Sequence, residues 1–298
     1  MGVLKDLTKE YFGEKVRKED EINIDGLDVE IVTFTDKNGK FHKKGYKPKD
    51  LDNLKELLKR MIEVRGNEGD FNDIDTSEIE SMNLLFYENK TFNGNISGWN
   101  VSKVKDMFGV FHTTSFNQDI SKWEFPNVLN MNYMFCNATS FNQDISKWKF
   151  PNVTNMESMF NGATSFNQPI GDWKFPNVTN MSCMFHNATS FNQPIGDWEF
   201  PNVEDMSAMF HNATSFNQDI SNWKFPNVTN MSYMFFGAKS FNQDMSKWKF
   251  PNVTNMESMF NGATSFNQNL SSWNLTDIKK NDIFKDCPIK YKYEPKMY

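Results

Sequence analysis

Hydrophobic residues along this chain follow a long period, not the short period of an isolated helix or strand. Ser-Phe-Asn-Gln occurs seven times, and the interval between copies is 25 residues, as from Ser115 to Ser140. The later copies begin at Ser165, Ser190, Ser215, Ser240 and Ser265. A fixed period of about 20 to 50 residues predicts a solenoid, in which each coil buries its apolar face only by stacking on its neighbours.

Each unit contains two short apolar patterns. Phe116 and Ile120 lie on the same side of an alternating run, which predicts a short strand, and stacked copies would form a parallel sheet. After Pro126 the apolar residues have helical spacing. This spacing predicts one or two turns of helix over Val128, Met131, Met134 and Phe135. The unit therefore predicts an α/β coil.

One large aromatic residue recurs in every unit. It stands at Trp99, Trp123, Trp148, Trp173, Trp198, Trp223, Trp248 and Trp273. Large aromatic side chains are mostly buried, so we interpret this column as core packing rather than a platform for stacking a ligand. The recurring Asn117 and Gln118 predict an amide ladder, because buried polar groups need hydrogen-bond partners.

The two ends of the chain differ from the repeats. The N-terminal part predicts a short helix from Leu4 to Phe12, then a β-hairpin with a strand over Val29–Thr35 and its turn at Asp36–Gly39. A further helix is expected from Asp50 to Arg65, with one apolar face. We divide the chain into an N-terminal hairpin and capping helix (1–70), the array (71–278) and a C-terminal cap (279–298), because an array needs covered ends. A separate function for the hairpin is the alternative.

The array begins with divergent units. Residues 79–86 and 91–99 match parts of the unit, but the interval from Phe92 to Phe116 is 24 residues. One residue fewer follows Phe111 than follows its counterparts. The spacing therefore slips by one residue at this point.

Composition and charge exclude several classes of protein. The net charge is −6, and the three arginines (Arg17, Arg60, Arg65) lie outside the repeats, so the chain lacks the basic patch of a nucleic-acid-binding protein. No stretch reaches the length of a transmembrane helix. Residues 1–20 are polar, which predicts no signal peptide and makes a cytoplasmic location one expectation.

The repeated unit resembles a known family. Asn-Val-Thr-Asn-Met-Ser-Tyr-Met-Phe at 227–235 and Gly-Ala-Lys-Ser-Phe-Asn-Gln-Asp at 237–244 resemble the BspA-like leucine-rich repeat surface proteins of bacteria. The resemblance covers about residues 73–278. It implies a right-handed leucine-rich-repeat-like solenoid and a role in adhesion at the bacterial surface. Most units depart from the family in the linker, with Trp-x-Phe-Pro-Asn-Val for the usual Trp-Asp-Val-Ser-Asn-Val.

The sequence predicts neither an enzyme nor a cofactor, because no catalytic motif is present. One column of side chains could attract a metal: His186 and His211 are neighbours in it, but the other members are His112, Cys136, Asn161, Phe236 and Asn261. Stacked aspartates such as Asp119 and Asp144 could attract a hard cation, although Pro169 and Pro194 replace them elsewhere, as expected of a turn position. We predict no metal site. The three cysteines, Cys136, Cys183 and Cys287, are expected to be free.

Three functions remain open. The first is a binding module that recognises a protein or glycan through the exposed strand face. Its candidate residues are Asn117, Asp119, Lys122, Asn142, Asp144, Lys147, Asn167, Asp172, Asn192, Asp197, Asn217, Asp219, Asn222, Asn242, Asp244 and Lys247. The second is an intracellular interaction or inhibitor protein with its specificity in the N-terminal hairpin. The third is a periodic polar array that binds an ordered lattice such as ice or a polysaccharide.

Overall fold

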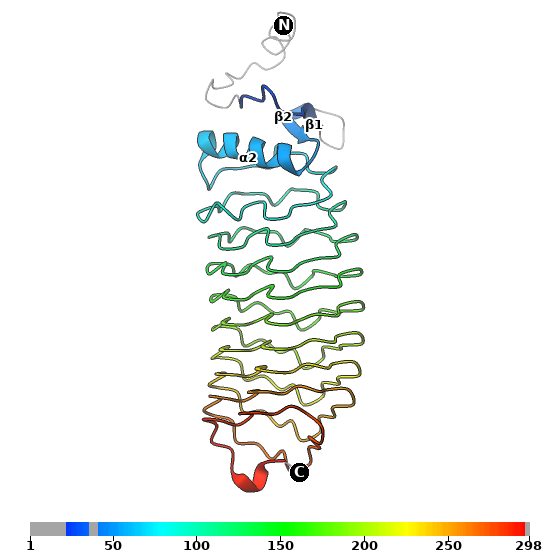
Figure 1. Cartoon of the computed structure of the whole chain (residues 1–298). Coiled ribbons are helices and arrows are strands. Elements are labelled where there is room, and N and C mark those ends of the chain that lie inside the picture. Colours follow the sequence, from blue (N-terminus) through cyan, green and yellow to red (C-terminus); the bar gives the residue numbers. More distant parts are fainter. Residues whose placement is uncertain (1–21, 36–40, 296–298) are drawn as a thin grey trace, which may run out of the picture.

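The chain forms an elongated stack of coils with the N-terminal hairpin at one end and the C-terminus at the other (Figure 1). The computed structural model describes residues 22–35 and 41–295. The helix expected over Leu4–Phe12 and the turn expected over Asp36–Gly39 lie outside these residues. Each coil runs once around the apolar core before the next coil begins.

A β-hairpin precedes the stack. Strands β1 (Val29–Thr35) and β2 (Phe41–Pro48) are antiparallel, with Val29 opposite Pro48, so the predicted pair of strands is confirmed. β2 also joins the first coil. The amide of Tyr46 donates to the Asp73 carbonyl (2.8 Å), and the amide of Asp75 donates to the Tyr46 carbonyl (2.8 Å). The hairpin is therefore hydrogen-bonded to the array.

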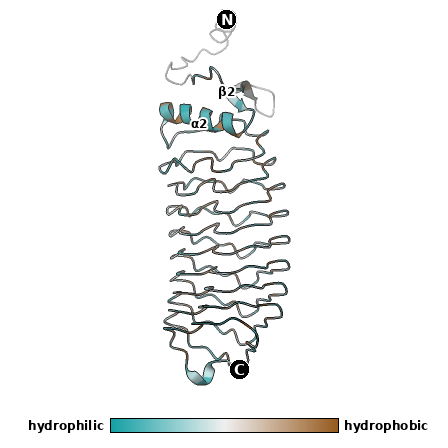
Figure 2. Ribbon diagram, viewed as in Figure 1, coloured by the Kyte–Doolittle hydropathy of each residue, from teal (hydrophilic) through white to brown (hydrophobic). Residues whose placement is uncertain are grey.

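Helix α2 (Leu51–Arg65) covers the open end of the stack, as the apolar pattern predicts. Asp50 caps its first turn by accepting from the Asn53 amide (2.9 Å), and the helix stops at Gly66, whose φ is +75°. The visible face of α2 is largely hydrophilic (Figure 2). Its other face is apolar and at most 3% exposed at Leu54, Leu57, Leu58 and Met61. Arg65 anchors the helix to the array through an ion pair with Asp73 (2.7 Å).

The backbone conformation within each coil differs from the prediction. Between residues 66 and 290 the chain forms neither the strand predicted over Phe116–Ile120 nor the helical turns predicted over Val128–Phe135. The coils consist of turns, with single parallel bridges such as Asn130 to Asn155. Beyond α2 the only helical element of the described chain is the short 3-10 helix η2 (Tyr291–Tyr293).

Left-handed residues explain why the methionine-rich half is not helical. Tyr133 has a φ of +57° and Asn137 a φ of +55°, and equivalent residues of other coils behave alike. Each such residue interrupts the right-handed helical course of the backbone, so that alternate N–H groups point toward the next coil. The amides of Met131, Tyr133, Phe135 and Asn137 donate to carbonyls of the next coil at 2.6 to 3.0 Å. We call 130–137 and its equivalents (81–88, 106–113, 155–162, 180–187, 205–212, 230–237 and 255–262) the ladder segments, and their exposed side the ladder face.

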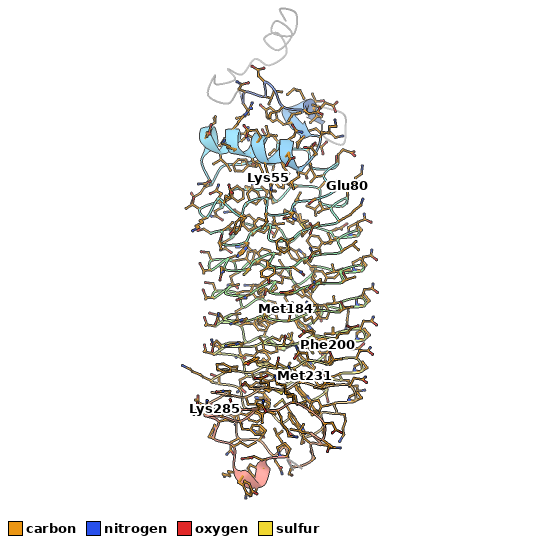
Figure 3. The ribbon with its side chains drawn as sticks, viewed as in Figure 1. Lys55, Glu80, Met184, Phe200, Met231 and Lys285 are labelled. Carbon is orange, nitrogen blue, oxygen red and sulfur yellow. The ribbon has the colours of Figure 1, made fainter. Side chains whose placement is uncertain are left out.

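Columns of apolar side chains fill the interior of the stack (Figure 3, where Met184, Phe200 and Met231 are labelled). Equivalent rings of successive coils stand nearly parallel to one another. Trp173 and Trp198 are 6.5 Å apart, Phe160 and Phe185 are 5.7 Å apart, and His186 and His211 are 4.3 Å apart. Of these three pairs, the two histidine rings on the ladder face are the closest together.

Polar side chains also join the coils along the Asn117 column. The Asn142 amide donates to Asn117 Oδ1 (2.9 Å), and Gln143 Nε2 donates to the Asn117 carbonyl (2.9 Å). The predicted amide ladder is confirmed. Each indole N–H donates to a carbonyl of the preceding coil, as Trp148 does to Ile120 (3.2 Å), but the Trp123 indole N–H has no partner in the described chain. Trp123 follows the one-residue slip before Phe116, which shifts the coil that would supply its acceptor.

Candidate functional site

The asparagines predicted to bind a ligand are part of the stack. Oδ1 of Asn117 accepts from both the Asn142 amide and the Gln143 side chain, and the pattern continues from coil to coil. Asn142, Asn167, Asn192, Asn217 and Asn242 accept in the same way. Their carbonyl oxygens are thus engaged within the protein, which reduces what this column offers to a ligand.

The predicted aspartate column closes turns. Oδ1 of Asp119, Asp144, Asp219 and Asp244 accepts from the amide two residues later at 2.8 to 2.9 Å. Hydrogen bonds from Ser121 hold the pKa of Asp119 below its usual value. Within the described residues, no group of three or more His, Cys, Asp or Glu side chains is placed to hold a metal ion.

The remaining predicted residues form an exposed column of mixed charge. Its members are Lys122, Lys147, Asp172, Asp197, Asn222 and Lys247. The sign of the charge changes twice along the stack, so the column has no net preference for an anion or a cation. The structure brings these residues together at one edge, as their shared place in the unit requires.

A shallow polar depression of about 600 Å³ follows another exposed column. It is lined by Asn152, Thr154, Asn177, Thr179, Asn202, Glu204 and Asn227. The asparagine Nδ2 atoms donate to proline carbonyls of the preceding coil, as Asn177 does to Pro151 (2.7 Å), and Thr179 Oγ1 donates to the Thr154 carbonyl (3.2 Å). The hypothesis of binding to an ordered lattice requires a periodic surface of this kind. Many of its hydrogen-bond donors, however, already bind carbonyl oxygens of neighbouring coils.

The ladder face carries residues that sequence reasoning did not select. The left-handed position is Tyr133, Ser158, Cys183, Ala208, Tyr233 or Ser258 in successive coils, and its predecessor is Asn132, Glu157, Ser182, Ser207, Ser232 or Glu257. Buried positions of the unit hardly vary, because each must fit its neighbours in the stack. The variation at these positions shows that stacking does not dictate them. This variation between repeats was the signal that could have located the face.

Two aromatic patches lie on the ladder face. In the first, Tyr133 packs near Phe108 (5.5 Å between ring centroids) and His112 (6.1 Å), and its hydroxyl donates to Glu157 Oε1 (2.8 Å). In the second, Tyr233 lies near Phe236 (6.0 Å), and its hydroxyl donates to Glu257 Oε1 (3.5 Å). The two patches are built alike, with a tyrosine beside a carboxylate of the next coil.

Stacked histidines lie between the patches. The rings of His186 and His211 are 4.3 Å apart and nearly parallel. Burial, with a further effect from the charge of His186, lowers the pKa of His211 to about 4. Burial also lowers the pKa of His186. Burial raises the pKa of the Cys136 thiol to about 11, so it is not poised as a nucleophile, and all three cysteines are free as predicted.

This histidine pair should make the protein less stable in mild acid. The unfolded His211 takes up a proton near its ordinary pKa of about 6.5, whereas the folded residue resists protonation until about pH 4. Its contribution to stability is therefore complete above about pH 6.5 and is lost as the pH falls toward 4. We expect His211→Asn, which places there the residue of Asn161 and Asn261, to reduce the loss of stability between about pH 7 and pH 5. Urea midpoints of the two proteins at both pH values test this, and equal losses would contradict it.

Comparison with known proteins supports one family. The family described as "Mycoplasma protein of unknown function, DUF285" matches residues 52–163, 125–211 and 197–292. No curated protein and no solved structure matches the chain. No helix within the described residues is long and apolar enough to cross a membrane. Because the three matches overlap and together run from the second residue of α2 into the last coil, the chain belongs to the DUF285 family.

Proposed function

We propose that this protein is a non-enzymatic binding module, a leucine-rich-repeat-like solenoid that recognises a protein or glycan at the bacterial surface. The observation that carries the proposal is the contrast between the nearly invariant core positions of the unit and the variable positions of the ladder face, which range from buried at Ser158 and Ser258 to exposed at Tyr233. A repeated scaffold with a variable face is the arrangement by which repeat proteins present extended binding surfaces. The surface location rests on the resemblance of the repeats to bacterial surface proteins.

The ladder face is the favoured contact surface for three reasons. Its exposed aromatic side chains, with Tyr87 42% and Tyr233 36% exposed, are of the type enriched in interfaces. Its polar groups differ from coil to coil, which allows a specific ligand to be distinguished. The face predicted from the sequence, in contrast, uses the oxygens of Asn117 and Asp119 within the protein.

A pair of matched variants tests which face binds. Ser207→Lys places a bulky cation in the middle of the ladder face, whereas Asn222→Lys adds the same charge at an exposed position outside the ladder segments, where Lys147 and Lys247 already occupy equivalent positions. Each variant and the wild type are tested for binding to immobilised matrix proteins and bacterial surface glycans. We expect Ser207→Lys to weaken binding about tenfold, as for an introduced clash in an interface, and Asn222→Lys to change it less than twofold.

The opposite result would move the site. Loss of binding with Asn222→Lys alone would assign the ligand to the face that carries Lys122, Asp172 and Asp197. If neither variant changes the binding, neither of these faces is the contact surface.

A further inference from the structure

Lys279, in the last coil, occupies a cation-binding position on the ladder face. We call such a position, a glutamate that accepts from a tyrosine hydroxyl, a cation seat. The Lys279 ammonium forms an ion pair with Oε2 of Glu257, whose Oε1 accepts from the Tyr233 hydroxyl. The Glu257 carboxylate raises the pKa of Lys279, and the charge of Tyr233 acts in the same direction. Carboxylate and tyrosine together thus hold an ammonium group at the edge of the ladder face.

The same two acceptor groups recur at Glu157 without the lysine. Oε1 of Glu157 accepts from the Tyr133 hydroxyl (2.8 Å), and Oε2 accepts from Asn180 Nδ2 (3.3 Å). Asn180 and Lys279 occupy equivalent positions, because each forms the bridge to the preceding coil, from Asn155 and Asn255 respectively. The Glu157 seat therefore has a neutral amide where the Glu257 seat has a cation.

The charge around the Glu157 seat favours a cation from outside. The ladder segments from 81–88 to 255–262 contain no lysine or arginine, but they contain Glu88, Asp106, Glu157, Asp205 and Glu257. Tyr133, whose hydroxyl contacts the carboxylate, packs in turn near the rings of Phe108 and His112. A lysine or arginine side chain can pair with the carboxylate and lay its apolar stem or its charge against such rings.

We propose that the ladder face binds a lysine- or arginine-bearing segment of a partner protein, with one cationic side chain paired with the Glu157 carboxylate next to Tyr133. This inference rests on the proposed binding function and names the chemistry of its ligand. Lys279 shows the geometry that the ligand's side chain adopts. The Glu157 carboxylate accepts one hydrogen bond at each oxygen, and each oxygen keeps a further lone pair for such a cation.

A short fluorescein-labelled peptide of alternating glycine and lysine serves as the probe, and fluorescence anisotropy with the full chain measures its binding. Glu157→Gln removes the carboxylate charge, and Glu199→Gln removes the same charge from an exposed site away from the ladder face. We expect Glu157→Gln to weaken binding about fivefold and Glu199→Gln less than twofold. Equal weakening by both would show that only net charge attracts the peptide, and would overturn the proposal.

A second matched pair blocks the seat instead of removing it. Asn180→Lys installs an internal cation at the position of Lys279, next to Glu157. Asn230→Lys adds the same charge in the same column, and both asparagines cap the amide two residues later, so the loss of that bond is matched. Weaker peptide binding by Asn180→Lys than by Asn230→Lys supports the seat. If both variants bind equally, Glu157 is not the seat.

The result also separates this inference from the proposed function. If Ser207→Lys abolishes binding to a matrix protein or a neutral glycan while Glu157→Gln leaves that binding intact, the ladder face binds but its ligand is not cationic. If the lysine peptide distinguishes Glu157→Gln from Glu199→Gln but Ser207→Lys affects no surface ligand, the cation seat stands and the adhesin-like function fails.

Discussion

Replacing Trp173 by alanine is expected to lower the free energy of unfolding by about 4 kcal/mol, within the usual range for a buried aromatic residue. The side chain is 1% exposed. It stacks on Trp198 (6.5 Å between ring centroids) and meets the edge of Phe150 (4.7 Å). Its indole N–H donates to the Ile145 carbonyl (3.1 Å), which the substitution would leave buried without this partner. The change damages two interfaces between coils at once.

Urea unfolding followed by circular dichroism and tryptophan fluorescence measures this loss. Because each coil depends on its neighbours, the two probes should also separate, as the halves of the array unfold at different urea concentrations. Lys174→Ala alters the exposed neighbour of Trp173 and should change stability by less than about 0.5 kcal/mol. A loss below about 1 kcal/mol for Trp173→Ala would contradict the role of the tryptophan column.

Phenylalanine substitutions separate the ring from its hydrogen bond. Trp173→Phe loses the bond to the Ile145 carbonyl, whereas the Trp123 indole has no partner in the described chain, so Trp123→Phe loses none. Trp173→Phe should therefore be the more destabilising of the two by about 1 kcal/mol.

Introducing a charge under the capping helix should be nearly as severe. Leu57 lies on the buried face of α2 and is fully buried. Leu57→Asp would place an unpaired carboxylate there. We expect a loss of about 4 kcal/mol or more, with detachment of α2 and exposure of the end of the array, because burying an unpaired charge is strongly unfavourable. Faster proteolysis of the first 70 residues and concentration-dependent association would report this detachment.

Val64→Asp is the matched control for the cap. It adds the same charge to the same helix, but Val64 is 50% exposed. The carboxylate would lie near the C-terminal end of α2, where the helix dipole disfavours it by about 0.5 kcal/mol. If both variants were equally stable, α2 would not hold the end of the stack closed.

The residues of the candidate site were only partly predictable from the sequence. Conspicuous polar repeats such as Asn117 and Asp119 were predicted to bind a ligand, but these residues repeat because the stack needs their hydrogen bonds. Tyr133 and Glu157 were overlooked, since they are separated by 24 positions and belong to different coils. Their contact depends on the offset between neighbouring coils, and a linear pattern does not display that offset.

The period of 25 residues was sufficient to say which side chains stack, since equal spacing brings Trp173 above Trp198 whatever path the backbone takes. Local signals were sufficient for α2 and the hairpin, because capping residues and apolar alternation act over a few neighbours. The path within a coil was not accessible in this way. Helical spacing over Val128–Phe135 did produce a common apolar side, yet Tyr133 takes a left-handed conformation that is unfavourable for an isolated residue. The hydrogen bond from its amide to Glu157 of the next coil offsets that cost, and this partner exists only once the coils have stacked.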